Sequence, residues 1–306
     1  MKSKKMWRLF AVLLVILLVS LPYVLIPNTL LVARVAVIHC NTDAGFRSLL
    51  KDRDRERWWP AAAADGYSFS VDEKLRRELH GYLEKGRERY RSKMFLLPIS
   101  KGDSFAIRWQ CTMRTGLNPI SRLTRYREAV HVADIMTMAL SSMGHFLEDD
   151  RNLYGFHIRT VMSPDSALIV THFATHGYPA TEEIYRNIGM LRKYIAAHGA
   201  RETNYPMMHV SSGVNGGCAT EVAVPLDREL PASGRVEFRR FIPWKTLSGE
   251  IRGGAATAEH AMQVLHQYVE DHQKTTMAMA FQSLVTDRDK EADTSKWITR
   301  VVVPVP

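Results

Sequence analysis

The sequence predicts an α+β protein of two folded domains that follow an N-terminal hydrophobic helix. Three observations lead to this class. Residues 34–150 read as a strand, a helix, several strands and one long helix, residues 154–306 contain one succession of strands and helix twice, and residues 1–33 hold a long uncharged run. The length of 306 residues suits two domains. Hydrophobic residues at 46% and charged residues at 24% exclude collagen-like and wholly disordered chains.

The N-terminal run from Leu9 to Pro27 contains no charged residue. Its nineteen residues approach the ~20 that a helix needs to cross ~30 Å of hydrocarbon. The cations of residues 1–33 lie before the run, which favours a cytoplasmic N-terminus. We therefore expect a tail and transmembrane anchor over 1–33, with a single span at about 9–27 and the bulk of the chain extracytoplasmic. A signal peptide cleaved near Ala33 or Ala36 and a buried core helix are the alternatives.

The distribution of charge argues against nucleic-acid binding. Of the formal charge of +9, residues 1–33 carry four cations and no acid, residues 34–153 carry 21 cations against 16 acids, and residues 154–306 carry 16 of each. A domain that binds phosphates concentrates cations where the backbone will lie. The second half is neutral and shows no helix-turn-helix pattern, so we expect no nucleic-acid partner.

Residues 34–150 contain the pattern of a sheet that packs on a terminal helix. RVAVIHC (34–40) alternates and is β-branched, which predicts a strand. Asn41 to Asp43 can cap a helix that includes Phe46, Leu49 and Leu50, and residues 66–112 read as strands and loops. The charge-dense stretch Glu73–Lys93 fits either a helix or two polar strands. Apolar residues at helical spacing from Ile120 to about Glu148 predict one long helix.

The opening RVAVIHCNTDAGFRSLLKDRDRERWWP, the pair Asp103-Ser104 before FAIRW, and the final helix resemble a START-like (SRPBCC) helix-grip domain. The resemblance covers about 34–150. It implies a curved antiparallel sheet that grips the last helix, and such domains usually enclose an apolar cavity.

The second half repeats itself. Leu191-x-x-Tyr194-Ile195 recurs as Leu265-x-x-Tyr268-Val269, and EVAVPL (221–226) recurs as RVVVPV (300–305). Each copy reads as strand, glycine-containing turn, amphipathic helix, strand, long loop and strand. A βα unit with one apolar helix face cannot bury that face alone, so we expect the two copies to pair about a pseudo-twofold axis. Their junction is predicted to form a concave site.

This layout resembles the GyrI-like effector-binding domain over about 154–306. The resemblance includes THGYPATEEIYRNIGMLRKYIAAHGA, the Ile242-Pro243 strand start, and a Trp297 strand that ends Val303-Pro304-Val305. It implies a small molecule bound in the groove between repeats, and hydrolysis of reactive compounds in a minority of members. The family commonly places a carboxylate at the base of the groove. Here Gln282 aligns with that position, and an amide offers hydrogen bonds without neutralising a cation, so no strong preference for lipophilic cations is expected.

The expected function is binding or sensing of a small apolar or amphipathic molecule without turnover. The candidate ligand-binding residues offer flat, polarisable or polar surfaces; they are Tyr178, Tyr205, Met207, His209, Trp244, Phe281, Gln282 and Trp297. No cofactor is implied, and a partner protein is not identified.

The alternatives are a hydrolase of a reactive hydrophobic compound and an envelope protein-interaction module. The chain lacks G-x-S-x-G, H-E-x-x-H and Walker motifs, so no catalytic residue is assigned. Glu291 or Asp293 is the acid that the hydrolase alternative would use. No metal site is expected, because His260, His266 and His272 rotate away from one another along a helix. Residues 213–217 read as a turn between strands.

Overall fold

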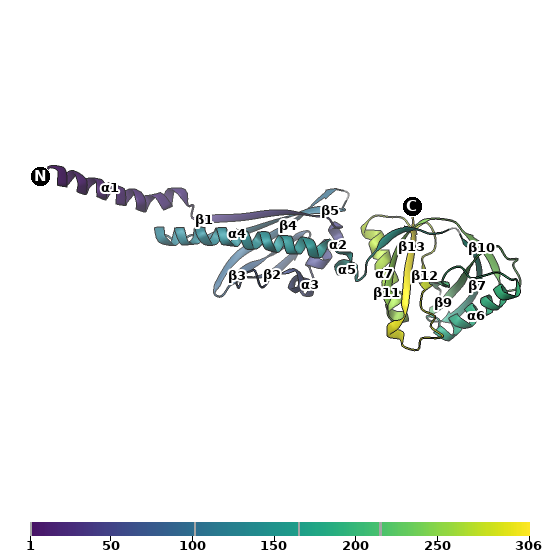
Figure 1. Cartoon of the computed structure of the whole chain (residues 1–306). Helices are drawn as coiled ribbons and strands as arrows, with labels where there is room; N and C mark the ends of the chain where they lie inside the picture. Colours follow the sequence, from purple (N-terminus) through teal and green to yellow (C-terminus); the bar gives the residue numbers. More distant parts are fainter. Residues whose placement is uncertain (1, 101, 165, 214–215) are drawn as a thin grey trace. The chain divides into compact units, whose positions relative to one another are not determined.

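The computed structural model describes residues 2–100, 102–164, 166–213 and 216–306. The chain divides into two compact units, Met1–Asp149 and Asp150–Pro306 (Figure 1). The predicted α+β class is confirmed, because each unit combines one antiparallel sheet with packed helices. Val214 and Asn215, in the predicted turn 213–217, lie outside the described residues.

The N-terminal helix α1 spans Lys2–Leu25 and contains Pro22. Within the described part of the chain, no helix combines the length and the apolar character that a membrane crossing requires. The predicted single-pass anchor and the cell-membrane localisation are therefore wrong. The helix ends at Leu25, before the apolar run does, and the uncharged part of the helix rises only roughly 25 Å at ~1.5 Å per residue, short of ~30 Å of hydrocarbon.

The first unit is a five-stranded antiparallel sheet with helices. The strand order is β1-β5-β4-β3-β2, and the charge-dense stretch forms strands, not a helix. Figure 1 shows α4 running along the sheet, the helix-grip arrangement. The elements are β1 (Thr29–Ile38), α2 (Thr42–Leu49), α3 (Asp52–Trp58), β2 (Ser68–Leu75), β3 (Glu78–Lys85), β4 (Glu88–Ser100), β5 (Ser104–Arg114) and α4 (Pro119–Leu147).

The helix α4 confirms the predicted long helix. Its first turn is capped by Asn118, whose side-chain oxygen accepts from the backbone N–H of Ile120 at 2.9 Å, and Pro119 occupies the first helical position. Met136 and Met143 on its inward side are fully buried, and the helix packs on β1 and β5. The core of this unit is thus closed by side chains from strands and helix together.

The second unit contains two copies of a strand-helix-strand-strand repeat. The first copy is β7 (Ser166–His176), α6 (Thr181–Ala197), β8 (Met207–Ser212) and β9 (Gly217–Leu226); the second is β11 (Lys245–Arg252), α7 (Ala255–Asp271), β12 (Phe281–Leu284) and β13 (Ile298–Val305). The remaining elements are α5 (Asp150–Tyr154), β6 (Arg159–Met162), β10 (Glu237–Phe241) and the short helix η2 (Thr294–Lys296).

The strand order is β10-β7-β9-β8-β12-β13-β11-β6. From the centre outward, each half contains the second, third and first strand of one copy and then one outer strand. The third strands of the copies, β9 and β13, each lie between the other two, and β8 pairs antiparallel with β12 through Met208 and Gln282. This order is the predicted pseudo-twofold arrangement. The helices α6 and α7 pack on β9 and β13 respectively.

The register assigns side chains to two faces of this sheet, since paired residues point to the same side. Val222, Met208, Gln282 and Val301 form one row across four strands, and Val222 and Met208 pack in the core under α6. Ala223, Met207, Ser283 and Arg300 form the neighbouring row on the opposite face. The helices therefore share one face and leave the other to the site.

The sheet curls away from the helices. β10 and β11 stand six strand spacings apart in the order, roughly 29 Å in a flat sheet, yet only residues 242–244 separate them in the chain. Four Cα–Cα steps reach at most about 15 Å. The backbone N–H of Ser163 donates to the Trp244 carbonyl at 2.8 Å and extends the pairing of β6 with β11 into this link. The face opposite the helices is therefore concave.

Candidate functional site in the curled sheet

A cavity of about 160 Å³ lies on the concave face. All eight strands of the second unit contribute to its wall, so the curl itself creates the cavity. Met207 and Phe281 come from the two central strands, one from each repeat, and Val302 lies beside them. We call this the central cavity. The wall is mostly apolar in area but also carries polar side chains, Ser283 and Arg300 among them, so it suits a hydrophobic group with a few polar atoms.

A second cavity of about 190 Å³ shares Met207, Phe241 and Phe281 with the central cavity. Phe241 and Phe281 meet edge to face, with ring centroids 5.7 Å apart and planes at 90°, a favourable geometry for aromatic pairs. Met279 adds a flexible thioether to the wall. Three methionines, Met207, Met208 and Met279, line this cavity, and we call it the methionine cavity.

A third cavity of about 420 Å³ shares Val161, Ser248 and Arg300 with the central cavity. The rest of its wall is largely polar and includes His157, Arg159 and Glu250; we call it the polar cavity. The three cavities are neighbours along the concave face, since the central cavity shares wall residues with each of the other two; we call them together the sheet groove. Its centre is apolar and its two ends carry charged side chains.

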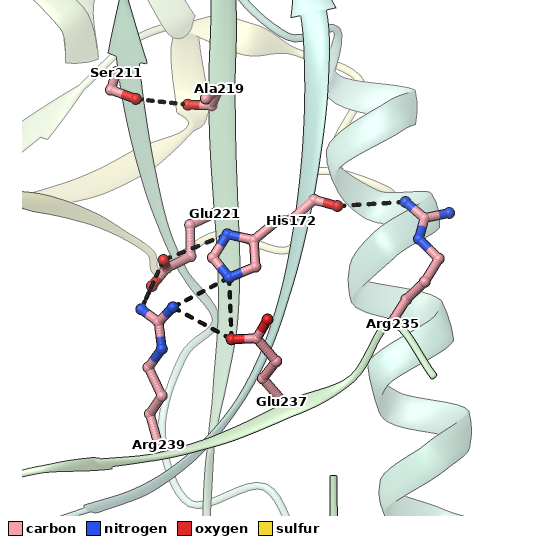
Figure 2. Close-up of polar contacts among 7 residues, drawn as sticks. All are labelled: His172, Ser211, Ala219, Glu221, Arg235, Glu237 and Arg239. Carbon is pink, nitrogen blue, oxygen red and sulfur yellow. Dashed lines mark hydrogen bonds and ion pairs between the residues drawn. The ribbon is translucent and has the colours of Figure 1, made fainter. Parts of the chain in front are cut away.

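The end at the methionine cavity is an ion-pair network (Figure 2). Arg239 Nη1 donates to Glu221 Oε1 and Oε2 at 2.9 and 2.8 Å, and its Nη2 approaches Glu237 Oε2 at 3.4 Å. The His172 ring lies between the two carboxylates, 3.6 Å from Glu221 and 3.5 Å from Glu237. Beside the network, Arg235 donates to the His172 carbonyl at 3.4 Å. We call Glu221, Glu237, Arg239 and His172 the acidic end.

The end at the polar cavity is built around Arg300. Its Nε and Nη2 both donate to Glu250 Oε1, at 3.1 and 2.6 Å. Arg159 and His157 line the same cavity and are exposed. We call Arg159, Arg300, Glu250 and His157 the basic end, because its guanidinium groups outnumber its carboxylates.

Four of the eight candidate ligand residues lie in the sheet groove. Tyr205 lines the central cavity, Met207 and Phe281 line both the central and the methionine cavities, and His209 lines the methionine cavity. The His209 ring is held in place by a 2.6 Å contact from Nδ1 to the Ala280 carbonyl. The structure thus brings these four side chains together on one face.

The other four candidates lie elsewhere. Tyr178 and Gln282 meet on the helix-bearing face, where Gln282 Nε2 donates to the Tyr178 hydroxyl at 3.2 Å. Trp297 is buried at 7% exposure, and its indole N–H donates to the Glu291 carbonyl at 2.7 Å. Trp244 lies in the link between β10 and β11, where its backbone bonds to Ser163.

A buried arginine that the sequence reading did not select lies on the helix-bearing face. Arg288 is 5% exposed, stacks over the Trp297 ring at 4.7 Å and donates to Thr299 Oγ1 at 2.8 Å. Its Nε and Nη1 have no hydrogen-bond partner among the described residues. Burial lowers the pKa of Arg288 and raises the pKa of Tyr178, since both charged forms lose hydration.

Sequence reasoning also missed the charged ends of the groove. The signal was present in the repeat, because EVAVPL and RVVVPV place Glu221 and Arg300 at equivalent positions. The two motifs share their valines and differ at the first position, where the charge is opposite.

Neither acid of the hydrolase alternative lies among the residues that line the three cavities. Asp293 Oδ1 accepts from the backbone N–H of Ser295 at 3.0 Å and so caps the short helix η2. Glu291 Oε1 accepts from the backbone N–H of Asp293 at 2.9 Å. In the described ranges, no group of three or more His, Cys, Asp or Glu side chains is arranged to hold a metal ion.

Comparisons with known proteins find similar solved structures but no matching family. No family model matches the chain, and no curated protein matches it. The EcmrR C-terminal domain is similar over 49% of this chain and 98% of its own length, at 14% identity and a TM-score of 0.44. A hydrolase from Listeria innocua is similar over 49% and 91% at 15% identity and a TM-score of 0.37. SAV2435 bound to tetraphenylphosphonium is similar over 49% and 93% at 13% identity and a TM-score of 0.32. Likenesses this distant do not identify a function for this chain.

Proposed function

We propose that the second unit binds a small apolar or amphipathic molecule in the sheet groove, without turnover. The observation that carries the proposal is that three neighbouring cavities lie on one concave face, and that Met207 and Phe281 from the central strands of both repeats line the middle one. A concave, mostly apolar site with few polar groups is the usual form of a small-molecule site. The resemblance to GyrI-like effector-binding domains supports the same function.

The apolar centre contributes affinity through a few side chains. Phe281 is half-buried, borders two of the cavities and contacts Phe241 edge to face. A ligand that covers this ring removes apolar surface from water, which contributes about 25 cal/mol per Å². Phe281 is therefore the side chain whose removal tests the site most directly.

The test measures binding of the neutral fluorescent dye N-phenyl-1-naphthylamine to the full chain. We expect saturable binding and a loss of affinity of about tenfold for Phe281→Ala, equal to about 1.4 kcal/mol. The matched control is Phe173→Ala, because Phe173 packs on the helix-bearing face against the core under α6; it should leave dye affinity unchanged. Circular dichroism confirms that both variants are folded.

Dye binding that survives Phe281→Ala but is lost in Phe173→Ala would place the ligand on the other face and contradict the proposal. Mass spectrometry of the recovered dye and of a metabolite pool after incubation tests for turnover. New mass-shifted products that depend on Glu291 or Asp293 would favour the hydrolase alternative.

A further inference from the structure

The two ends of the sheet groove occupy equivalent positions in the two repeats. Glu221 begins EVAVPL in β9, and Arg300 begins RVVVPV in β13. In the sheet register Glu221 pairs with His172 of β7, and Arg300 pairs with Glu250 of β11. The pseudo-twofold arrangement thus relates an acid at one end of the groove to a guanidinium at the other.

The outer strands repeat this exchange. Glu237 of β10 pairs with Val170, two residues before His172, and Arg159 of β6 pairs with Ser248, two residues before Glu250. Glu237 and Arg159 are therefore equivalent positions, and again an acid at the acidic end corresponds to an arginine at the basic end. At these two pairs of equivalent positions the strand pairing is the same and the charge is opposite.

The two ends differ in how far their charges are already compensated. At the acidic end, Arg239 binds both oxygens of Glu221 and approaches Glu237 (Figure 2). Arg240, which also lines the methionine cavity, lies 3.7 Å from Glu229. Both guanidinium groups of this end therefore have carboxylate partners. At the basic end, Glu250 binds Arg300, and Arg159 adds a second guanidinium to the same cavity. Fully ionised, the two guanidiniums and one carboxylate leave an excess positive charge there.

We propose that the sheet groove binds an amphipathic anion, with its apolar chain in the central cavity and its anionic head in the polar cavity between Arg159 and Arg300. Guanidinium groups bind carboxylate and phosphate heads through charge-assisted hydrogen bonds. Val161 and Ser248 border both cavities, so a chain in the first can extend its head into the second. This assignment rests on the proposed function and adds the polarity of its ligand.

The test compares ligands of one chain length that differ in the head group. Decanoate, decanol, decylamine and decyl phosphate each displace N-phenyl-1-naphthylamine from the full chain, below their critical micelle concentrations. We expect decanoate to bind five- to tenfold more tightly than decanol, and the preference to shrink as salt rises, since the basic end is solvent-accessible. Decyl phosphate that binds more tightly than decanoate would support the anion site and assign it a phosphate-like head.

Two variants separate the head-group site from the general charge of the protein. Arg159→Gln/Arg300→Gln should remove the preference for decanoate and keep decanol affinity. The matched control, Arg53→Gln/Arg87→Gln, removes the same two positive charges at exposed positions of the first unit, and it should keep the preference.

Equal binding of decanoate and decanol, or tighter binding of decylamine, would overturn the anion assignment while the dye result still supports the proposed function. Absence of dye binding would instead overturn the proposed function. If the arginine double variant is unfolded, Arg159→Gln alone tests the inference, because Arg159 is exposed on an outer strand; an unchanged preference in that variant at low salt would contradict it.

Discussion

Glu128 of α4 is held by three side chains of the first unit. Its carboxylate accepts from the Tyr90 hydroxyl at 2.5 Å, the Tyr67 hydroxyl at 3.2 Å and Arg125 Nη1 at 2.7 Å. Burial alone would raise the pKa of Glu128, but the hydrogen bonds from Tyr90 and Arg125 outweigh it and lower the pKa below its ordinary 4.5. Burial, and after it the contacts with Glu128, raises the pKa of both tyrosines.

Glu128→Gln is expected to destabilise the first unit by about 1–2 kcal/mol at pH 7, since charge-assisted hydrogen bonds are lost. The folded pKa is lowered, so the carboxylate contributes its stability above about pH 4.5 and loses it as the pH falls through the folded pKa. The difference between wild type and variant should therefore shrink at acid pH. Urea denaturation at pH 7 and at pH 3.5 measures it, with exposed Glu56→Gln as the control. A difference that stays constant with pH would contradict this account.

At the residue scale, the types of side chain that line the groove could be predicted from the sequence, but the face of the sheet that each side chain occupies could not. Met207 and Phe281 line the groove, whereas Gln282, which was predicted to lie at the base of the same groove, faces the helices. A strand of four residues offers too little alternation to fix its inward side, and a shift of one position exchanges the faces. The register of β12 with β8 and β13 determines which of its side chains face the groove, and the sequence does not show that register.

At the element scale, two glycines show why a strand and a helix place different demands on the same residue. A Cβ on Gly249 of β11 would lie 2.4 Å from two ring carbons of buried Phe156. A Cβ on Gly189 of α6 would meet no atom within 4 Å. The first glycine permits close packing, whereas the second only weakens its helix.

Gly249→Ala should destabilise the second unit by about 1–3 kcal/mol, because the methyl group overpacks the core. Gly189→Ala should stabilise the unit by about 0.5–1 kcal/mol, because alanine favours the helix. Thermal denaturation of the two single variants measures both signs in one assay. Adding Phe156→Leu to Gly249→Ala should recover part of the loss; a double variant less stable than the sum of its single changes would argue against the clash.

The elements themselves were largely predictable from periodicity. The long helix α4 and both repeats lie where apolar spacing placed them. The stretch Glu73–Lys93 was ambiguous because its buried leucines, Leu79 and Leu83, are four residues apart, a spacing common to one face of a helix and one face of a strand. Arg77 at φ 64° and Gly86 at φ 58° make the turns that resolve the stretch into strands. Pairing of β3 with β2 and of β4 with β5 further stabilises the strands over a helix.

At the scale of the whole molecule, the repeat predicted the arrangement of the second unit but not the closure of its sheet. The doubled motifs imply pairing about an axis. The closure depends on the outer strands β6 and β10, which lie outside the repeated motifs. β6 pairs with β11, the first strand of the second copy, and β10 pairs with β7, the first strand of the first copy. Short exposed strands carry a weak hydrophobic pattern, so the concave groove that they enclose was visible only in the fold.

We propose that the two units, Met1–Asp149 and Asp150–Pro306, are domains that unfold independently, since each has its own sheet and buried core. Leu83 and Leu191 are fully buried, one in each unit, and form a matched pair. Leu83→Ala and Leu191→Ala should each destabilise only their own unit, by about 2–5 kcal/mol. Native-state hydrogen exchange of the full chain, resolved by peptide, measures both units at once. Faster exchange of the slowest amides should be confined to residues 2–149 in the first variant and to 150–306 in the second. Faster exchange of both cores in either variant would show one cooperative structure, and the boundary near residue 150 would then not separate two domains.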